Sequence, residues 1–264
     1  MDLIRRLFTA ALVAGVLSGT AASVVQQATT VPLILEAEKY EVVTPPPATA
    51  AAPTTAAPAG APAASHAEGH QHGPVREVGE GVPVTLDEAM QRIGLTIAAN
   101  LIAGVAYALL LAAAILLAGR PVDARRGLVW GMGGFVAVSL APSFGLAPEL
   151  PGMAGAELEL RQLWWLSAAA GAGVGIAALA FARNRLVIAV AILAAALPHL
   201  IGAPHPESAE GAVPPELAAR FVTASLGSAA LFWAILGSVC GWLMSGVVEP
   251  AESRPALRVQ PGAR

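Results

Sequence analysis

Apolar stretches alternate with short polar ones along most of the chain, and six of them are long enough to cross a bilayer. They cover residues 7–29, 95–118, 127–146, 163–182, 186–203 and 221–248. A spanning helix needs about 20 mostly apolar residues, and these stretches contain no Asp, Glu, Lys or Arg. The pattern predicts an all-α integral membrane protein with about six transmembrane helices.

Composition supports the membrane class. Charged residues make up 12% of the chain, about half the share found in soluble domains. Glycine recurs inside the apolar stretches, as in "GMGGF", "GAGVG" and "LGSVCGW". Because small residues let helix backbones approach closely in lipid, we interpret these glycines as helix-packing positions.

The first stretch has a second interpretation. "MDLIRRLFTAALVAGVLSGTAAS" has the basic start and apolar centre of a signal peptide. Its apolar character continues through "VVQQATTVPLILEAE", which favours an uncleaved span; cleavage would leave five spans. The expected organisation is a first span (1–29), a loop rich in Pro and Ala with a His tract (30–94), a membrane domain of five spans (95–248) and a tail (249–264).

Arginine and lysine segregate between alternate ends of the predicted spans. The N-terminal end, the second–third and fourth–fifth connections and the C-terminal tail hold ten of the 15 Lys and Arg residues. Cytoplasmic loops carry this excess in membrane proteins. We therefore expect both termini in the cytoplasm and the 30–94 loop outside the membrane.

A weak internal echo accompanies the spans. "LAPSFGLAPELPG" and "LPHLIGAPHPE" each place Pro near the outer end of a span, then Gly, then Pro-Glu. This similarity suggests three parallel helical hairpin repeats, an arrangement known in transporters. Proline is also a common helix-terminating residue, so the echo has a simpler explanation.

Three of the five histidines lie in the stretch "SHAEGHQHG". His66, His70 and His72 surround Glu68, but the spacing differs from the H-E-x-x-H of zinc proteases. Imidazoles in a short His-rich tract are a compositional signal for binding metals such as zinc, copper, nickel or cobalt. The alternative is a solvated linker without a metal-binding role.

Other candidate residues lie at the ends of the spans or inside them. His199 lies near the outer end of the fifth span, where an ionisable side chain suggests function, although an interfacial position or a carbonyl hydrogen bond would also explain it. The remaining candidates are a second outer histidine, acidic residues of a possible outer vestibule, and intramembrane polar groups that more often join helices than bind ligands: His205; Glu36, Glu38, Glu149 and Glu216; Gln26 and Asn100.

Several enzyme motifs do not occur in the sequence. There is no phosphate-binding G-x-x-x-x-G-K-[ST], no G-x-S-x-G and no cysteine pair, since Cys240 is the single cysteine. No basic patch for nucleic acid stands out, and the net charge is -3. We expect neither an enzyme nor a nucleic-acid-binding protein.

The sequence resembles the CbtA family of cobalt transporter subunits. The resemblance rests on "RRLFTAALVAGVLSG", "PLILEAEKYE", "HAEGHQH", "RRGLVWGMGGFVAVSLAPSFGLAPELPGM", "RQLWWL", "LPHLIGAP" and "VPPELAARF". It implies Co²⁺ uptake across a bacterial inner membrane in support of cobalamin synthesis, with Co²⁺ as substrate, no organic cofactor and a small single-span partner, CbtB. A transporter of nickel or another divalent ion, and a non-transporting metal-binding scaffold or sensor, remain alternatives.

Overall fold

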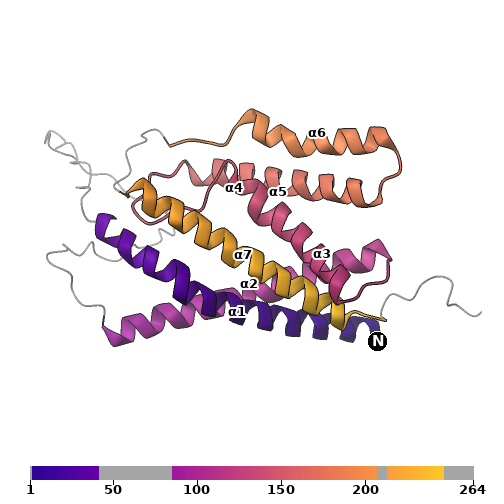
Figure 1. Ribbon diagram of the computed structural model, residues 1–264, viewed down its shortest axis with the longest axis horizontal. Helices are drawn as coiled ribbons and strands as arrows, with labels where there is room; N and C mark the ends of the chain where they lie inside the picture. The colour runs from indigo at the N-terminus through magenta and orange to yellow at the C-terminus, as the bar shows by residue number, and fades with distance from the viewer. Residues whose placement is uncertain (1, 42–84, 207–212, 247–264) are drawn as a thin grey trace, which may run out of the picture.

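The computed structural model describes residues 2–41, 85–206 and 213–246, and within these ranges the regular elements are helices. The elements are α1 (Asp2–Glu41), α2 (Leu86–Ala118), α3 (Ala124–Phe135), a π-helix (Val136–Leu140), α4 (Ala141–Ser143), α5 (Leu158–Phe181), α6 (Arg185–Ile201) and α7 (Pro215–Leu243). Figure 1 shows the long helices running roughly along one axis, with α3 and α4 crossing them obliquely. The predicted all-α class is confirmed for the described part of the chain.

Four described helices are long and apolar enough to cross a membrane. They are α1, within Leu3–Tyr40, α2, α5 and α7. The fifth predicted span corresponds to α6, which is shorter, and the third is divided among α3, the π-helix and α4. The count of six spans is therefore not confirmed.

The π-helix in the third predicted span lies directly before a proline. The Ala141 N–H donates to the Val136 carbonyl, five residues back, which is the π-type hydrogen bond. Pro142 follows and has no backbone N–H, so the carbonyl of Val138 has no donor four residues ahead. The three elements continue one another from residue 124 to 143 as a helical rod.

Helix pairing differs from three successive hairpins. α1 and α2 form an antiparallel hairpin, as do α5 and α6, but α3 packs mainly against α7. Among the described elements, α6 contacts α5 and has no contact with α7. The predicted hairpin repeats are not confirmed, because the elements pair between distant parts of the chain rather than only in sequence order.

Glycine pairs on both helices bring α3 and α7 together. Gly127 and Gly131 on α3 face Gly237 and Gly241 on α7. A Cβ atom on Gly237 would lie 2.6 Å from the Cα of Gly131, and one on Gly241 would lie 2.6 Å from the Cα of Gly127. The two backbones are thus in direct contact, which confirms the packing role expected for these glycines.

α1 belongs to the core of the bundle. Ala10, Ala11 and Ala14 are buried between α2 and α7, and Gly15 meets the backbone of Gly104 on α2. α1 continues as a helix beyond residue 29, where the first predicted span ends, to Glu41. At 1.5 Å per residue it is about 60 Å long, twice the hydrocarbon thickness of about 30 Å.

The basic residues collect at one end of the bundle. The start of α1, the α2–α3 connection and the α5–α6 connection lie together in Figure 1. We call this the basic end; its arginines are Arg5, Arg6, Arg120, Arg125, Arg126, Arg183 and Arg185. The opposite end holds the end of α1, the starts of α2, α5 and α7, and the end of α6.

Replacing Gly237 by alanine is expected to destabilise the α3–α7 contact. The new Cβ would force the helices apart, and overpacking of this kind costs about 1–3 kcal/mol. Gly227→Ala is the matched control, because no atom lies within 4 Å of a Cβ at that position of the same helix. We expect thermal unfolding in detergent to show a lower melting temperature for Gly237→Ala alone. Equal melting temperatures for the two variants would contradict the contact.

Candidate functional site

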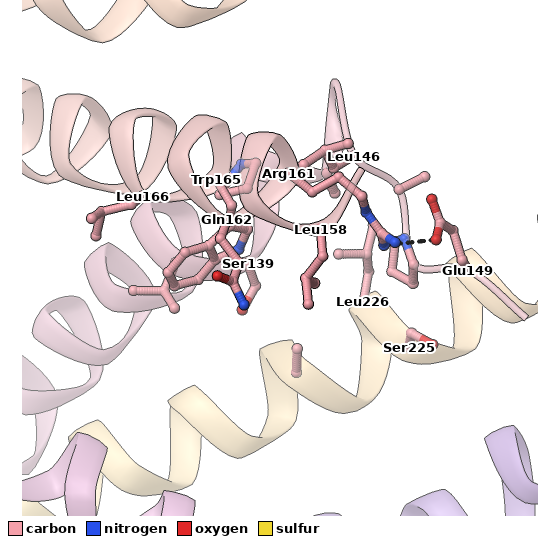
Figure 2. Close-up of a pocket in the computed structure, with 16 residues that line it drawn as sticks. Ser139, Leu146, Glu149, Leu158, Arg161, Gln162, Trp165, Leu166, Ser225 and Leu226 are labelled. Atoms are coloured by element: carbon pink, nitrogen blue, oxygen red, sulfur yellow. Dashed lines mark ion pairs between the residues drawn. The ribbon is translucent and has the colours of Figure 1, made fainter. Parts of the chain in front are cut away.

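A cavity of about 670 Å³ opens at the opposite end, between the π-helix and α4 on one side and α5 and α7 on the others (Figure 2). Apolar side chains form most of its wall. The polar residues that line it are Ser139, Ser143, Glu149, Arg161, Gln162 and Ser225. We call it the outer cavity.

An ion pair lies at the edge of the outer cavity. Arg161, in the first turns of α5, points toward Glu149 of the α4–α5 connection (Figure 2), with 2.7 Å between Nη2 and Oε2. Both side chains are about one-third exposed or less. The pair joins the connection to α5 and compensates the charge of the only carboxylate among the lining residues.

The π-helix contributes a hydroxyl to this cavity. Ser139 Oγ accepts a hydrogen bond of 3.3 Å from the indole Nε1 of Trp233 on α7. π-Helical turns are rare and are often found at functional sites. The outer cavity is therefore bordered by the one irregular turn in the described helices.

His199 joins α6 to α4 at the same end of the bundle. Its Nε2 lies 3.0 Å from the Ala141 carbonyl oxygen, and its Nδ1 lies 3.2 Å from that of Ala195. The ring also contacts Trp164 edge to face, with 5.5 Å between centroids. Both ring nitrogens thus lie near backbone carbonyl oxygens, and since a neutral imidazole has one N–H, it can donate to one of them. His205 is exposed in the connection after α6.

Two of the acidic residues expected to form an outer vestibule are paired with cations. Glu36 Oε2 lies 2.6 Å from Lys39 Nζ on the same helix. Glu38 accepts two hydrogen bonds from Arg92 on α2, of 2.7 and 3.3 Å. With Glu149 also paired, these carboxylates form local ion pairs, so their combined negative field is weaker than the sequence suggests.

The remaining predicted ligands do not gather with them. Glu216 is exposed in the first turn of α7. His66, Glu68, His70 and His72 lie outside the described residues. Within residues 2–41, 85–206 and 213–246, no three His, Cys, Asp or Glu side chains are close enough to hold a metal ion.

Gln26 and Asn100 do come together, across the α1–α2 contact. The Asn100 amide donates to Gln26 Oε1 at 2.7 Å and to Ser23 Oγ at 3.0 Å. Ser23 in turn donates to the Gly19 carbonyl. These polar groups satisfy one another between two helices, which supports the interpretation that they join helices.

The comparison with known families adds one decisive observation. The family model for CbtA, described as a probable cobalt transporter subunit, matches residues 4–245. The chain belongs to the CbtA family. No match was found among curated proteins or among solved structures. The family description is that of a transporter subunit, which is not an enzyme, and it indicates Co²⁺ as the substrate. The four membrane-capable helices support a multi-pass membrane protein.

The matched region includes the described helices of this CbtA chain, except for the first two residues of α1. It therefore includes the outer cavity, the Glu149–Arg161 pair and the amide cluster at Asn100. Sequence reasoning identified Glu149, Gln26 and Asn100 individually. Ser139 was likewise expected as an intramembrane polar group, but neither the pairing of Arg161 with Glu149 nor the cavity was identified, since nothing local in the sequence indicates which connection lies over α5.

Asn100 and Gln26 should be coupled energetically. Asn100→Leu removes the interhelical hydrogen bonds, and such bonds average about 0.6 and reach about 1.7 kcal/mol in membrane proteins. Gln26 and Asn100 are the two partners of one hydrogen bond. The double variant Gln26→Leu/Asn100→Leu should therefore lose less free energy of unfolding than the two single variants lose in sum. Gln27→Leu, on the neighbouring position, is the control for removing an amide. Unfolding of the purified protein measures the stability of the two single variants, the double variant and the control. If the two single losses add up to the loss in the double variant, the coupling is contradicted.

Proposed function

We propose that this chain is the membrane subunit of a Co²⁺ uptake system in a bacterial inner membrane and supplies cobalt for cobalamin synthesis. It acts with a small CbtB-like subunit. The observation that carries the proposal is the family match over residues 4–245, in a chain whose arginine-rich connections gather at one end of the bundle.

The segregation of arginine supports a direction across the membrane. Cytoplasmic loops of membrane proteins are rich in Lys and Arg, so the basic end lies in the cytoplasm and the outer cavity faces the periplasm. The ends of the His-containing segment, Glu41 and Thr85, adjoin α1 and α2 at the same end as that cavity. Both features therefore meet arriving metal from the same side.

The His tract acts as the outer collector of metal. Imidazole is a suitable ligand for Co²⁺, but the Irving–Williams order makes Ni²⁺ and Cu²⁺ bind such ligands more tightly. His66, His70 and His72 raise the local metal concentration without selecting cobalt. Selection therefore belongs to a later step or to the metal supply.

Glu149 is the first anionic group of the outer cavity that such an ion meets. The Arg161 guanidinium forms an ion pair with this carboxylate at 2.7 Å, so an approaching dication competes with the guanidinium for Glu149. Hydroxyl and amide oxygens of Ser139, Gln162 and Ser225 line the cavity. They supply hard oxygen groups that replace part of the water shell during passage.

Membrane potential is a sufficient energy source for this route. The sequence has no ATP-binding P-loop. An inward-negative potential contributes about 2.3 kcal/mol per charge per 100 mV, hence about 4.6 kcal/mol for a dication. Uptake of Co²⁺ down this gradient needs no nucleotide hydrolysis by this chain.

Radioactive cobalt uptake in cells that lack other cobalt importers tests the proposal. The cells carry this chain with its presumed partner, and we compare it with the triple variant His66→Ala/His70→Ala/His72→Ala and with His199→Ala. We expect protein-dependent uptake that falls several-fold in the triple variant at low metal and recovers at high metal, because a collector affects capture rather than passage. His199→Ala should act through stability, so its uptake is corrected for protein abundance.

Nickel competition separates this proposal from its nearest alternative. Uptake that survives excess Ni²⁺ supports cobalt as substrate, whereas loss of uptake supports a nickel transporter. No protein-dependent uptake, with membrane abundance verified, would contradict transport and leave a metal-binding scaffold or sensor.

Glu149→Gln tests the role of the outer cavity separately. The amide cannot attract a dication as the carboxylate does, so we expect half-maximal uptake to need several-fold more Co²⁺. Glu159→Gln is the matched control, since Glu159 lies on the same helix as Arg161 and is exposed outside the cavity lining. Equal apparent affinities of the two variants would show that ions do not pass Glu149.

A further inference from the structure

A second cavity, of about 710 Å³, lies at the basic end between α2, α3 and α5. We call it the inner groove. Its walls are mostly apolar and include Leu110, Ala114, Val129, Ile176 and Ala180. The proposed route for Co²⁺ makes no use of it, and an apolar wall offers a dication no ligand.

The inner groove is open along one side. α2 and α5, which form its edges, do not contact each other, and α3 forms the floor between them. Small residues on the floor and one edge leave space: nothing lies closer than 3.8 Å to a Cβ on Gly133, or than 4.0 Å to one on Gly173. Since α2 and α5 are long and apolar enough to cross a membrane, we infer that the open side between them faces lipid.

Two cations stand at the mouth of the groove. The Arg120 guanidinium lies 4.7 Å from the centre of the Phe181 ring, and Arg126 Nη1 donates to the Pro121 carbonyl at 2.8 Å. A guanidinium has five N–H donors, so both arginines keep donors for another acceptor. No acidic residue is among the lining residues of the groove, but Asp123 lies beside its mouth and forms an ion pair between exposed side chains with Arg126, with 4.0 Å between Oδ2 and Nε. The mouth is therefore suited to an anion, and planar guanidinium groups bind phosphate well.

The length of the groove matches one leaflet. From Arg126 at the mouth to Val138 at the deep end, α3 and the π-helix rise about 18 Å, close to half of the ~30 Å hydrocarbon core. Trp233 and Val138 line the deep end. A transmembrane helix of a partner would need a groove across the whole membrane, whereas an acyl chain with a phosphate head group needs this length with its charge at one end.

We propose that the inner groove binds an anionic phospholipid of the leaflet at the basic end. The phosphate lies between Arg120 and Arg126, and one acyl chain lies along α3 over Gly133. Anionic lipids attract basic residues beside the membrane by about 1 kcal/mol per Lys or Arg. This lipid site is independent of the transported ion and of the direction of transport.

Native mass spectrometry of the full chain tests this proposal. The protein is purified in detergent and titrated with phosphatidylglycerol or with phosphatidylcholine of the same acyl chains. The variant Arg120→Gln/Arg126→Gln removes the mouth charges, and Arg183→Gln/Arg185→Gln removes two exposed arginines of the same end outside the groove. Gly133→Leu fills the groove and keeps both cations. Gly94→Leu is its control at an open helical glycine.

We expect retention of phosphatidylglycerol over phosphatidylcholine. The Arg120/Arg126 variant should weaken that retention by about tenfold, Gly133→Leu should reduce it with the charges intact, and the two controls should remain within about twofold. Unchanged helix content and elution volume verify folding. Equal retention in every variant, no preference for the anionic lipid, or a copurifying single-span subunit in place of lipid would overturn the proposal. Because no cobalt is present, failure here leaves the transport test unaffected.

Discussion

The direct backbone contact between α3 and α7 is the constraint on which the rest of the arrangement depends. Gly127 and Gly131 meet Gly237 and Gly241 without side chains between them. α7 also packs along α1, which packs along α2, so this contact sets the position of the first hairpin relative to the α3–α4 rod. In lipid no hydrophobic force draws apolar helices together, and packing this close is what holds them.

The same contact places the π-helix beside Trp233 and so determines where the chain is hollow. Val138 lines both cavities, and Ser139 and Trp233 are joined by a hydrogen bond beside it. Both walls are mostly apolar. The outer cavity adds hydroxyl, amide and carboxylate groups with Arg161, whereas the inner groove adds Arg120 and Arg126 without a carboxylate among its lining residues. One irregular turn thus separates two sites of different chemistry: the first is suited to a cation and the second to an anionic amphiphile.

The sequence predicts the class of this fold better than its packing. Hydropathy and arginine segregation indicate the helices and the common end of Arg120 and Arg183, because both depend on composition in sequence order. The pairing of α3 with α7 is not predictable in this way, since an apolar segment in lipid shows the same pattern on every face. The same limit applies to the outer cavity. The charge of Glu149 marks it as a candidate in the sequence, but its pairing with Arg161 depends on how the α4–α5 connection lies over α5.

Under the proposed function, the partial exposure of the Glu149–Arg161 pair has a kinetic consequence. An ion pair that is partly open to water contributes only about 0–1 kcal/mol, so a dication that separates it loses little. A bare carboxylate would hold Co²⁺ more strongly and release it more slowly, whereas conduction requires binding that is favourable but weak enough for exit. Arg161 therefore acts as a competing cation that lowers the affinity of Glu149 for metal. It keeps the outer cavity a place of passage, while the imidazoles that precede it serve to collect the metal.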